Sequence, residues 1–256
     1  MRRVLICLFA VGAVACEDNP CREPQKLDEA HERFNERSEE WIAEADPYPL
    51  QIEKVAEKRE ALIPYRAKLI RGREADTAKM IDAFVAGDVP RVHALVNEAQ
   101  KASMTYGWKL FDLGFDLHNL FTTEQRSKIA KAMSEPPEPF STPFLANRAI
   151  DYVMFKIDAD DAQKSAVQAS LRKTEKQINV MLKQQHTTKV KLLETWTAKT
   201  PDLPLARKTV QKSSDDVTAF VHGLVDESAT LAQQFRPEQK TFVFDRLNRM
   251  KTCPAQ

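Results

Sequence analysis

The chain has 256 residues, with 38 Lys and Arg against 37 Asp and Glu and only 6 glycines. A formal net charge of +1 offers no electrostatic basis for binding nucleic acid, so no nucleic-acid partner is expected. The scarcity of glycine disfavours a sheet protein with many turns, and the length allows one large domain or two small ones.

Residues 1–15 have the pattern of a secretory signal peptide. Two arginines precede an apolar run at 4–14, which is too short to span a bilayer. The stretch 13–16, AVAC, resembles a bacterial lipobox, although alanine stands where leucine is usual. We therefore expect Cys16 to be the acylated N-terminus of the mature chain, with an ordinary signal peptide as the alternative. Glu17, rather than aspartate, follows the cysteine and favours the periplasmic face of the outer membrane over the inner membrane.

Proline and charge patterns divide the rest of the chain. Residues 16–24 are short and polar and are predicted to be a lipidated tether. A first helical repeat is expected at 25–135, a proline-rich linker at 136–143 and a second helical repeat at 144–256. Few apolar residues occur within 25–45, which predicts a solvated helix over the edge of a core.

The two helical repeats share markers 114 residues apart. Asp-x-Pro occurs at 88–90 and 202–204, and Phe-x-x-Glu-Gln at 121–125 and 235–239. At this offset, nine positions of 88–134 match, where random pairing of such compositions gives about three. Upstream, the two copies align if the second carries two extra residues in its loop. We interpret the chain as a diverged tandem duplication with an all-α fold of long helices.

The Phe-x-x-Glu-Gln stretch has the form of a helix start. In the first copy, Thr122 can cap the helix and Gln125 can reach back to it as a capping box. In the second copy, Arg236 replaces the capping threonine, while proline suits the first helical position and glutamate faces the helix dipole. The members of this helix-start motif are Phe121, Thr122, Glu124, Gln125, Phe235, Pro237, Glu238 and Gln239.

Residues 121–125 resemble the Leu-Thr-x-x-Gln signature of the Spy/CpxP family of exported helical stress proteins. Both copies have phenylalanine where that family has leucine, and the second copy lacks the threonine. The likeness extends over most of 45–135 and 160–250 as two long helices with an acidic break, followed by this motif. It implies ATP-independent work on client proteins or on an envelope stress sensor, and a cradle-shaped dimer of antiparallel helices. A duplicated chain could supply both halves of the cradle, so we expect a monomer that acts as a pseudo-dimer.

No metal site is predicted. The five histidines have no other histidine or cysteine three or four residues away, and their positions do not repeat between the copies: His31, His93, His118, His186 and His222. His222 and Asp226, one helical turn apart, are interpreted as a solvated ion pair. The run 158–161, DADD, resembles the start of a calcium loop but lacks its glycine and final glutamate, so it is interpreted as the start of a helix.

Catalytic motifs are not found in the sequence. It has no glycine-rich phosphate loop, no Gly-x-Ser-x-Gly and no His-Glu-x-x-His, so neither an enzyme nor a cofactor is expected. The leading hypothesis is a chaperone-like envelope lipoprotein that binds unfolded or envelope client proteins during stress. The alternatives are a sensor of stress or metal that docks on a signalling partner, and a purely structural lipoprotein.

Two cysteines remain after processing. Cys21 and Cys253 lie a few residues outside the helical repeats, one near each end of the chain. Because an exported chain meets an oxidising compartment, we expect a disulfide between them. Unpaired or intermolecular thiols are the alternative.

Overall fold

The computed structural model describes residues 27–141 and 144–251, over which every element of regular structure is a helix. The predicted all-α fold is therefore confirmed. The signal peptide, the tether, Cys16, Cys21 and Cys253 lie outside the described residues. In chain order the elements are α2 (Leu27–Ala43), α3 (Pro49–Glu60), α4 (Ile63–Val85), α5 (Val89–Asp116), the 3₁₀ helix η2 (His118–Leu120), α6 (Thr123–Met133), α7 (Phe144–Lys156), α8 (Asp161–Thr197), α9 (Leu203–Gln233) and α10 (Pro237–Lys251).

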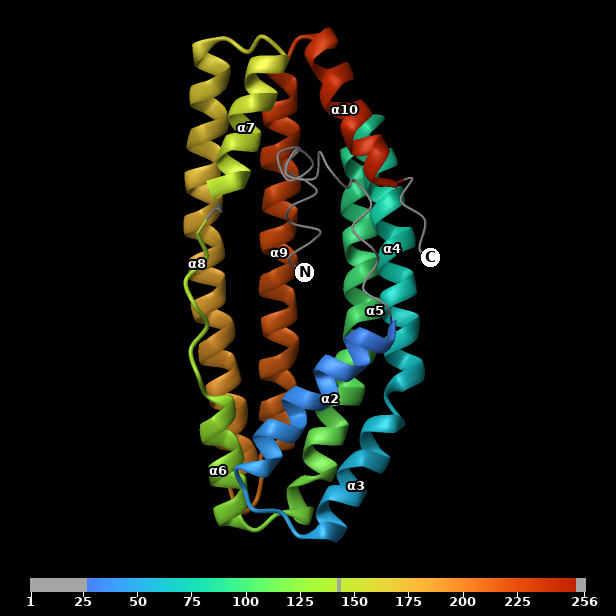
Figure 1. The fold of residues 1–256 in the computed structure, drawn as a ribbon, viewed down its shortest axis with the longest axis vertical. Coiled ribbons are helices and arrows are strands. Elements are labelled where there is room, and N and C mark those ends of the chain that lie inside the picture. The colour runs from blue at the N-terminus through green and yellow to red at the C-terminus, as the bar shows by residue number, and fades with distance from the viewer. Residues whose placement is uncertain (1–26, 142–143, 252–256) are drawn as a thin grey trace.

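Four long helices form the body of an elongated molecule (Figure 1). Helix α4 packs on α5 and α8 packs on α9, and the two pairs meet where α5 and α9 run antiparallel to each other. The short helices cross between the pairs. Helix α6, which follows α5, packs on α8, and α10, which follows α9, packs on α4. Each half of the chain therefore ends in a helix that contacts the other half.

The helices α5 and α9 begin in the same way. Asp88 and Asp202 cap them by accepting hydrogen bonds from the backbone N–H groups three residues on, at 3.0 and 2.9 Å. A proline follows in the first turn of each helix, where a missing N–H costs no hydrogen bond. Residues 86–88 lead into α5 and residues 198–202 into α9. The second connection is two residues longer, as the sequence alignment predicts.

Apolar packing is divided among three clusters. The central one joins α4, α5, α9 and α10, and its residues Val92, Leu95 and Val225 are fully excluded from solvent. Burial of side chains of this size stabilises the fold by about 1.5–3 kcal/mol each. The other two clusters lie toward the two ends and are built from similar residues, Ala45, Val55, Phe121 and Ile129 in one and Ile157, Val167, Phe235 and Val243 in the other.

The linker is held along the side of the bundle. Residues 135–141 are not helical, and the backbone N–H and C=O of Phe140 both bond to the side-chain amide of Asn179 on α8, at 2.7 and 2.8 Å. Helix α2 packs on α4 and α6, so the helix predicted within 25–45 is present at the edge of the bundle. None of the helices in the described ranges is both long enough and apolar enough to cross a membrane.

Candidate functional site

The helix-start motif forms a capping box in its first copy. The Thr122 hydroxyl accepts from the Gln125 backbone N–H at 3.2 Å, and the Gln125 side chain accepts from the Thr122 N–H at 3.0 Å. In the second copy only the second of these bonds remains, in which the Gln239 side chain accepts from the Arg236 N–H at 2.8 Å. Arg236, at the position of the capping threonine, pairs through its guanidinium with Glu238 at 2.9 Å, so Glu238 has a side-chain partner besides the helix dipole.

Gln125 also belongs to a buried pair of amides. Its side chain and that of Gln51, at the start of α3, donate to each other at 3.1 Å in both directions. The Gln51 amide donates to the Leu120 carbonyl at 2.6 Å and accepts from the Tyr48 N–H at 2.7 Å. Gln125 donates a further bond to the carbonyl of Asp46, at 3.4 Å. The pair thus fastens the start of α3 to the start of α6.

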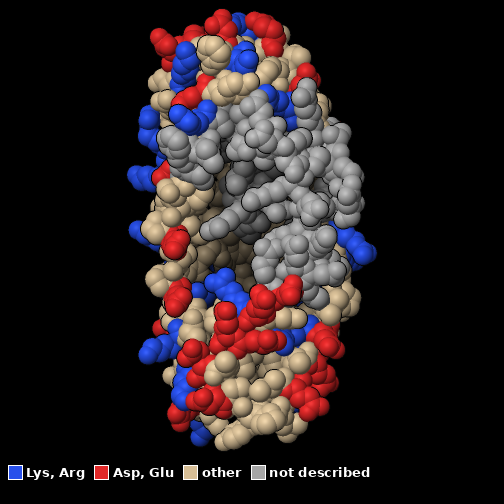
Figure 2. Space-filling model, viewed as in Figure 1, with Lys and Arg blue, Asp and Glu red and all other residues tan. Residues whose placement is uncertain are grey.

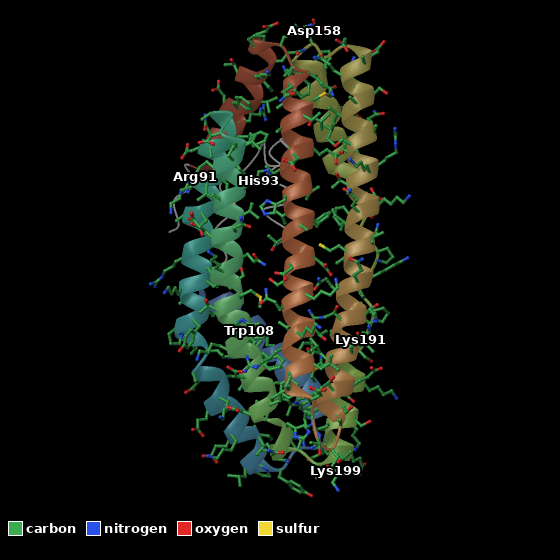
Figure 3. The ribbon with its side chains drawn as sticks, turned by 180° about the vertical axis from the view of Figure 1, so that it is seen from behind. Arg91, His93, Trp108, Asp158, Lys191 and Lys199 are labelled. Atoms are coloured by element: carbon green, nitrogen blue, oxygen red, sulfur yellow. The ribbon has the colours of Figure 1, made fainter. Side chains whose placement is uncertain are left out.

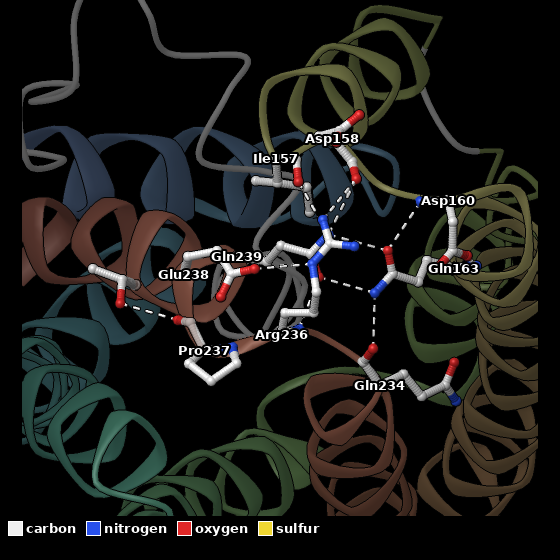
Figure 4. Close-up of polar contacts among 10 residues, drawn as sticks. Ile157, Asp158, Asp160, Gln163, Gln234, Arg236, Pro237, Glu238 and Gln239 are labelled. Atoms are coloured by element: carbon white, nitrogen blue, oxygen red, sulfur yellow. Dashed lines mark hydrogen bonds and ion pairs between the residues drawn. The ribbon is translucent and has the colours of Figure 1, made fainter.

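A second amide pair occupies the opposite end of the molecule (Figure 4). Gln163, at the start of α8, and Gln239, at the start of α10, donate to each other at 2.9 and 3.1 Å. Gln163 also donates to the Gln234 carbonyl at 2.8 Å and accepts from the Asp160 N–H at 3.0 Å. Gln239 donates to the Ile157 carbonyl at 3.0 Å. Every polar atom of these two buried side chains therefore has a partner, which is what burial of an amide requires.

The residues that complete the two amide pairs were not identified from the sequence. Gln51 and Gln163 each lie five residues after an aspartate with a positive φ, 48° at Asp46 and 49° at Asp158. The spacing Asp-x-x-x-x-Gln is therefore repeated and was a usable signal. Asp160 caps α8 by accepting from the Gln163 N–H at 2.8 Å, so the run 158–161 begins a helix as predicted.

The interface between α5 and α9, named here the seam, contains polar contacts formed by residues at corresponding positions of the two halves. His93 on α5 bonds to Asp226 on α9 at 2.8 Å, while Asp112 on α5 forms an ion pair with Arg207 on α9. Arg207 corresponds to His93, and Asp226 to Asp112, at the offset of 114 residues. Between these contacts Gln100 bonds to Asp215 at 3.1 Å. The same pair of positions is thus used twice, once on each side of the middle of the seam.

The interpretation of His222 and Asp226 as an ion pair within one helix is wrong. Asp226 bonds to His93 on the facing helix, and His222 bonds to His93 and to Asn97. The antiparallel crossing of α5 and α9 brings these non-repeating histidines together, which spacing along the sequence could not reveal. Among the described residues no group of three His, Cys, Asp or Glu is arranged to hold a metal ion. His118 is buried and bonds to the Ala198 carbonyl at 2.8 Å.

One end of the molecule carries exposed apolar side chains, named here the apolar end. It comprises Tyr48, Leu50 and Ile52 at the start of α3, and Leu203 and Leu205 at the start of α9, with exposed fractions between 41% and 67%. Both segments adjoin η2, because Gln51 bonds to the Leu120 carbonyl and Ala198 bonds to His118. Figure 1 places the connections α2–α3 and α8–α9 at the same end.

Charged side chains surround this part of the surface. Figure 2 shows lysines and arginines mixed with acidic residues over one face, with one group of acidic residues in its lower half, where α2 crosses, and another at its upper edge. Exposed apolar groups among mixed charges form a surface that can contact a polypeptide of varied sequence.

Comparison of the chain with protein-family models, with curated proteins and with solved structures finds no match.

Proposed function

We propose that this chain is an exported envelope lipoprotein that binds unfolded client proteins without ATP. The observation that carries the proposal is the apolar end, a group of large apolar side chains that the fold leaves in solvent. The resemblance of residues 121–125 to the Spy/CpxP signature supports the same class of activity. The anchor would be a lipid on Cys16, which would hold the protein at the periplasmic face of the outer membrane.

The fold does not require the exposed residues to be apolar. At the opposite end, the positions that correspond to Tyr48, Leu50 and Ile52 are Asp160, Ala162 and Lys164. These positions begin a helix that keeps the buried amide pair and a complete N-cap. Since polar or small residues satisfy the same local structure, the apolar residues are free to serve binding.

We also propose that the two halves arose by duplication and form a pseudo-dimer. The support is internal. The first glutamines of the two buried amide pairs, Gln51 and Gln163, are 112 residues apart in the sequence. The second glutamines, Gln125 and Gln239, are 114 residues apart. The difference of two residues equals the insertion in the connection that leads into α9. Helices α6 and α10 are exchanged between the halves in the same manner. Such an exchange is the arrangement that two separate copies would use to form a symmetric dimer.

The experiment that tests client binding is suppression of aggregation. The purified chain, at a one-to-one ratio and without ATP, should keep a chemically denatured client from aggregating on dilution. Replacing Leu50 and Ile52 with glutamine should weaken this activity, because burying one such side chain contributes about 1.5–3 kcal/mol. Loss of both predicts an affinity at least about tenfold lower.

The matched control replaces Ala162 and Lys164 with glutamine, at the corresponding positions of the other end. This variant should retain full activity. Equal activity of both variants and the unmodified chain would remove the apolar end from the proposal. No suppression by the unmodified chain would favour the sensor or the structural lipoprotein instead.

A further inference from the structure

Two imidazoles from opposite halves of the chain lie in direct contact. The Nδ1 atoms of His93 on α5 and His222 on α9 are 2.5 Å apart, and the ring centroids 4.6 Å. The other nitrogen of each ring is also engaged, since His93 Nε2 lies 2.8 Å from the Asp226 carboxylate and His222 Nε2 lies 3.0 Å from the Asn97 side-chain oxygen. His93 and its side of the bundle are seen in Figure 3.

Proton counting limits the states that this arrangement accepts. A carboxylate only accepts hydrogen bonds, so His93 carries its proton on Nε2. The Asn97 oxygen is also an acceptor, so His222 carries a proton on Nε2 as well. The Nδ1 contact then requires one further proton, donated by one ring to the lone pair of the other, and the pair that shares it carries a single positive charge beside the Asp226 carboxylate. A proton on both Nδ1 atoms would place two N–H groups, each on a positively charged ring, against each other at 2.5 Å. The contact therefore accepts at most one proton between the rings, and a second proton breaks it.

The surroundings oppose the second proton. Burial lowers the pKa of His222, the neighbouring His93 lowers it further, and Asp226 on the same helix acts in the opposite direction. Neither α4, which packs on α5, nor α8, which packs on α9, supplies a described charged residue that contributes to this shift. The groups that decide the protonation of the pair are thus His93, His222 and Asp226, with Asn97 as a neutral partner.

The corresponding contact on the other side of the seam has no such limit. There Arg207 pairs with Asp112 and lies over the ring of Trp108, with 5.3 Å from the guanidinium carbon to the ring centroid. Trp108 occupies the position that corresponds to His222. Arginine keeps its charge throughout the range in which histidine titrates. The two sides of one seam therefore differ in their response to pH.

We propose that the His93–His222 pair is a pH-sensitive fastening between the two halves of the protein. While the pair carries one shared proton, the rings hold α5 and α9 together at this side. In acid the second proton separates the rings, and the seam loosens here while the contact of Arg207 with Asp112 holds. This inference rests on the contact between α5 and α9 and does not depend on client binding.

Histidine-ring NMR on the full chain tests the protonation of the pair. The His93–His222 pair should take up its protons in two steps separated by more than about one pH unit, as interacting sites do. In His93→Gln the ring of His222 should titrate at higher pH than in the unmodified chain, because a neutral amide replaces the second imidazole. Independent titration of the two rings in the unmodified chain, with the titration of His222 unchanged in His93→Gln, would overturn the proposal.

Hydrogen exchange of the unmodified chain tests the loosening without any variant. Between pH 7.5 and pH 5, after correction for the intrinsic rate, amides around residues 93 and 222 should lose protection. Amides around 112 and 207 provide the internal control and should keep theirs. Equal loss at both places, or none at either, would contradict a fastening at the histidine pair.

Discussion

Gln163 and Gln239 lie 76 residues apart in the chain and hold each other by two amide hydrogen bonds inside the protein. They join the start of α8 to the start of α10, and Gln51 with Gln125 does the same for α3 and α6 at the other end. The glutamine of the repeated sequence motif is therefore more than a helix cap. It is half of a buried contact that sets where the last helix of each half begins.

The first prediction concerns this contact. Gln239→Met, which keeps the side-chain volume, should lower the free energy of unfolding by about 2–4 kcal/mol. Each buried polar group left without a partner costs about 1–3 kcal/mol, and the change would strand several. Urea denaturation at constant pH measures the effect. Gln168→Met, on the exposed face of α8, is the control and should change stability by less than about 0.5 kcal/mol. Similar values for the two variants would mean that the amide pair is dispensable.

Sequence patterns located several helix starts but not the partners of those helices. Asp-x-Pro and the helix-start motif located the beginnings of α5, α6, α9 and α10, because caps act within one turn of the chain. The packing of α6 on α8 and of α10 on α4, each in the other half, is a tertiary contact that no local sequence pattern encodes. The contact of His93 with His222 is likewise tertiary, because it depends on the packing of α5 against α9 and joins residues 129 apart in the sequence.

The apolar end illustrates a different limit. The sequence shows that Leu50 and Leu205 are apolar, but helical periodicity by itself assigns apolar residues to a core. In the structure these two side chains stay exposed, although their neighbours Gln51 and Ala206 are buried. Burial had to be observed before these residues could be proposed as a binding surface.

The second prediction concerns the two halves. A protease site inserted between Pro137 and Glu138, in the exposed linker, should allow cleavage without dissociation. The fragments should stay together because α6 packs on α8 and α10 packs on α4. Light scattering should give the mass of one chain before cleavage and the same mass after it. A stable dimer of the intact chain, or separate fragments after cleavage, would contradict the pseudo-dimer.

The third prediction concerns the anchor. Cys16→Ser should move the protein from the membrane fraction to the soluble periplasmic fraction, because acylation of that cysteine is the proposed attachment. Fractionation followed by immunoblotting measures the change. Cys21→Ser, which leaves the lipobox intact, is the control and should remain with the membrane. An unmodified protein that is already soluble would disprove the lipid anchor.

The fourth prediction is a disulfide between Cys21 and Cys253. The bond would close a loop of about 230 residues. In the entropy model it raises the free energy of the unfolded chain by roughly 5 kcal/mol, and by less if the ends are already docked in the fold. It would fasten the end of α10 beside the tether. Intact mass under non-reducing conditions, with peptide mapping, should detect the bond in protein taken from the periplasm. Free thiols at both positions would rule it out.

Client contact at the apolar end is the central claim, and site-specific photocrosslinking tests it most directly. A photoreactive phenylalanine analogue at position 50 should crosslink to a chemically unfolded client and not to the same client when folded. The analogue at position 162, the corresponding exposed position of the other end, should give little crosslinking with either form. Equal yields at positions 50 and 162, or no crosslink at position 50, would contradict the proposed binding surface.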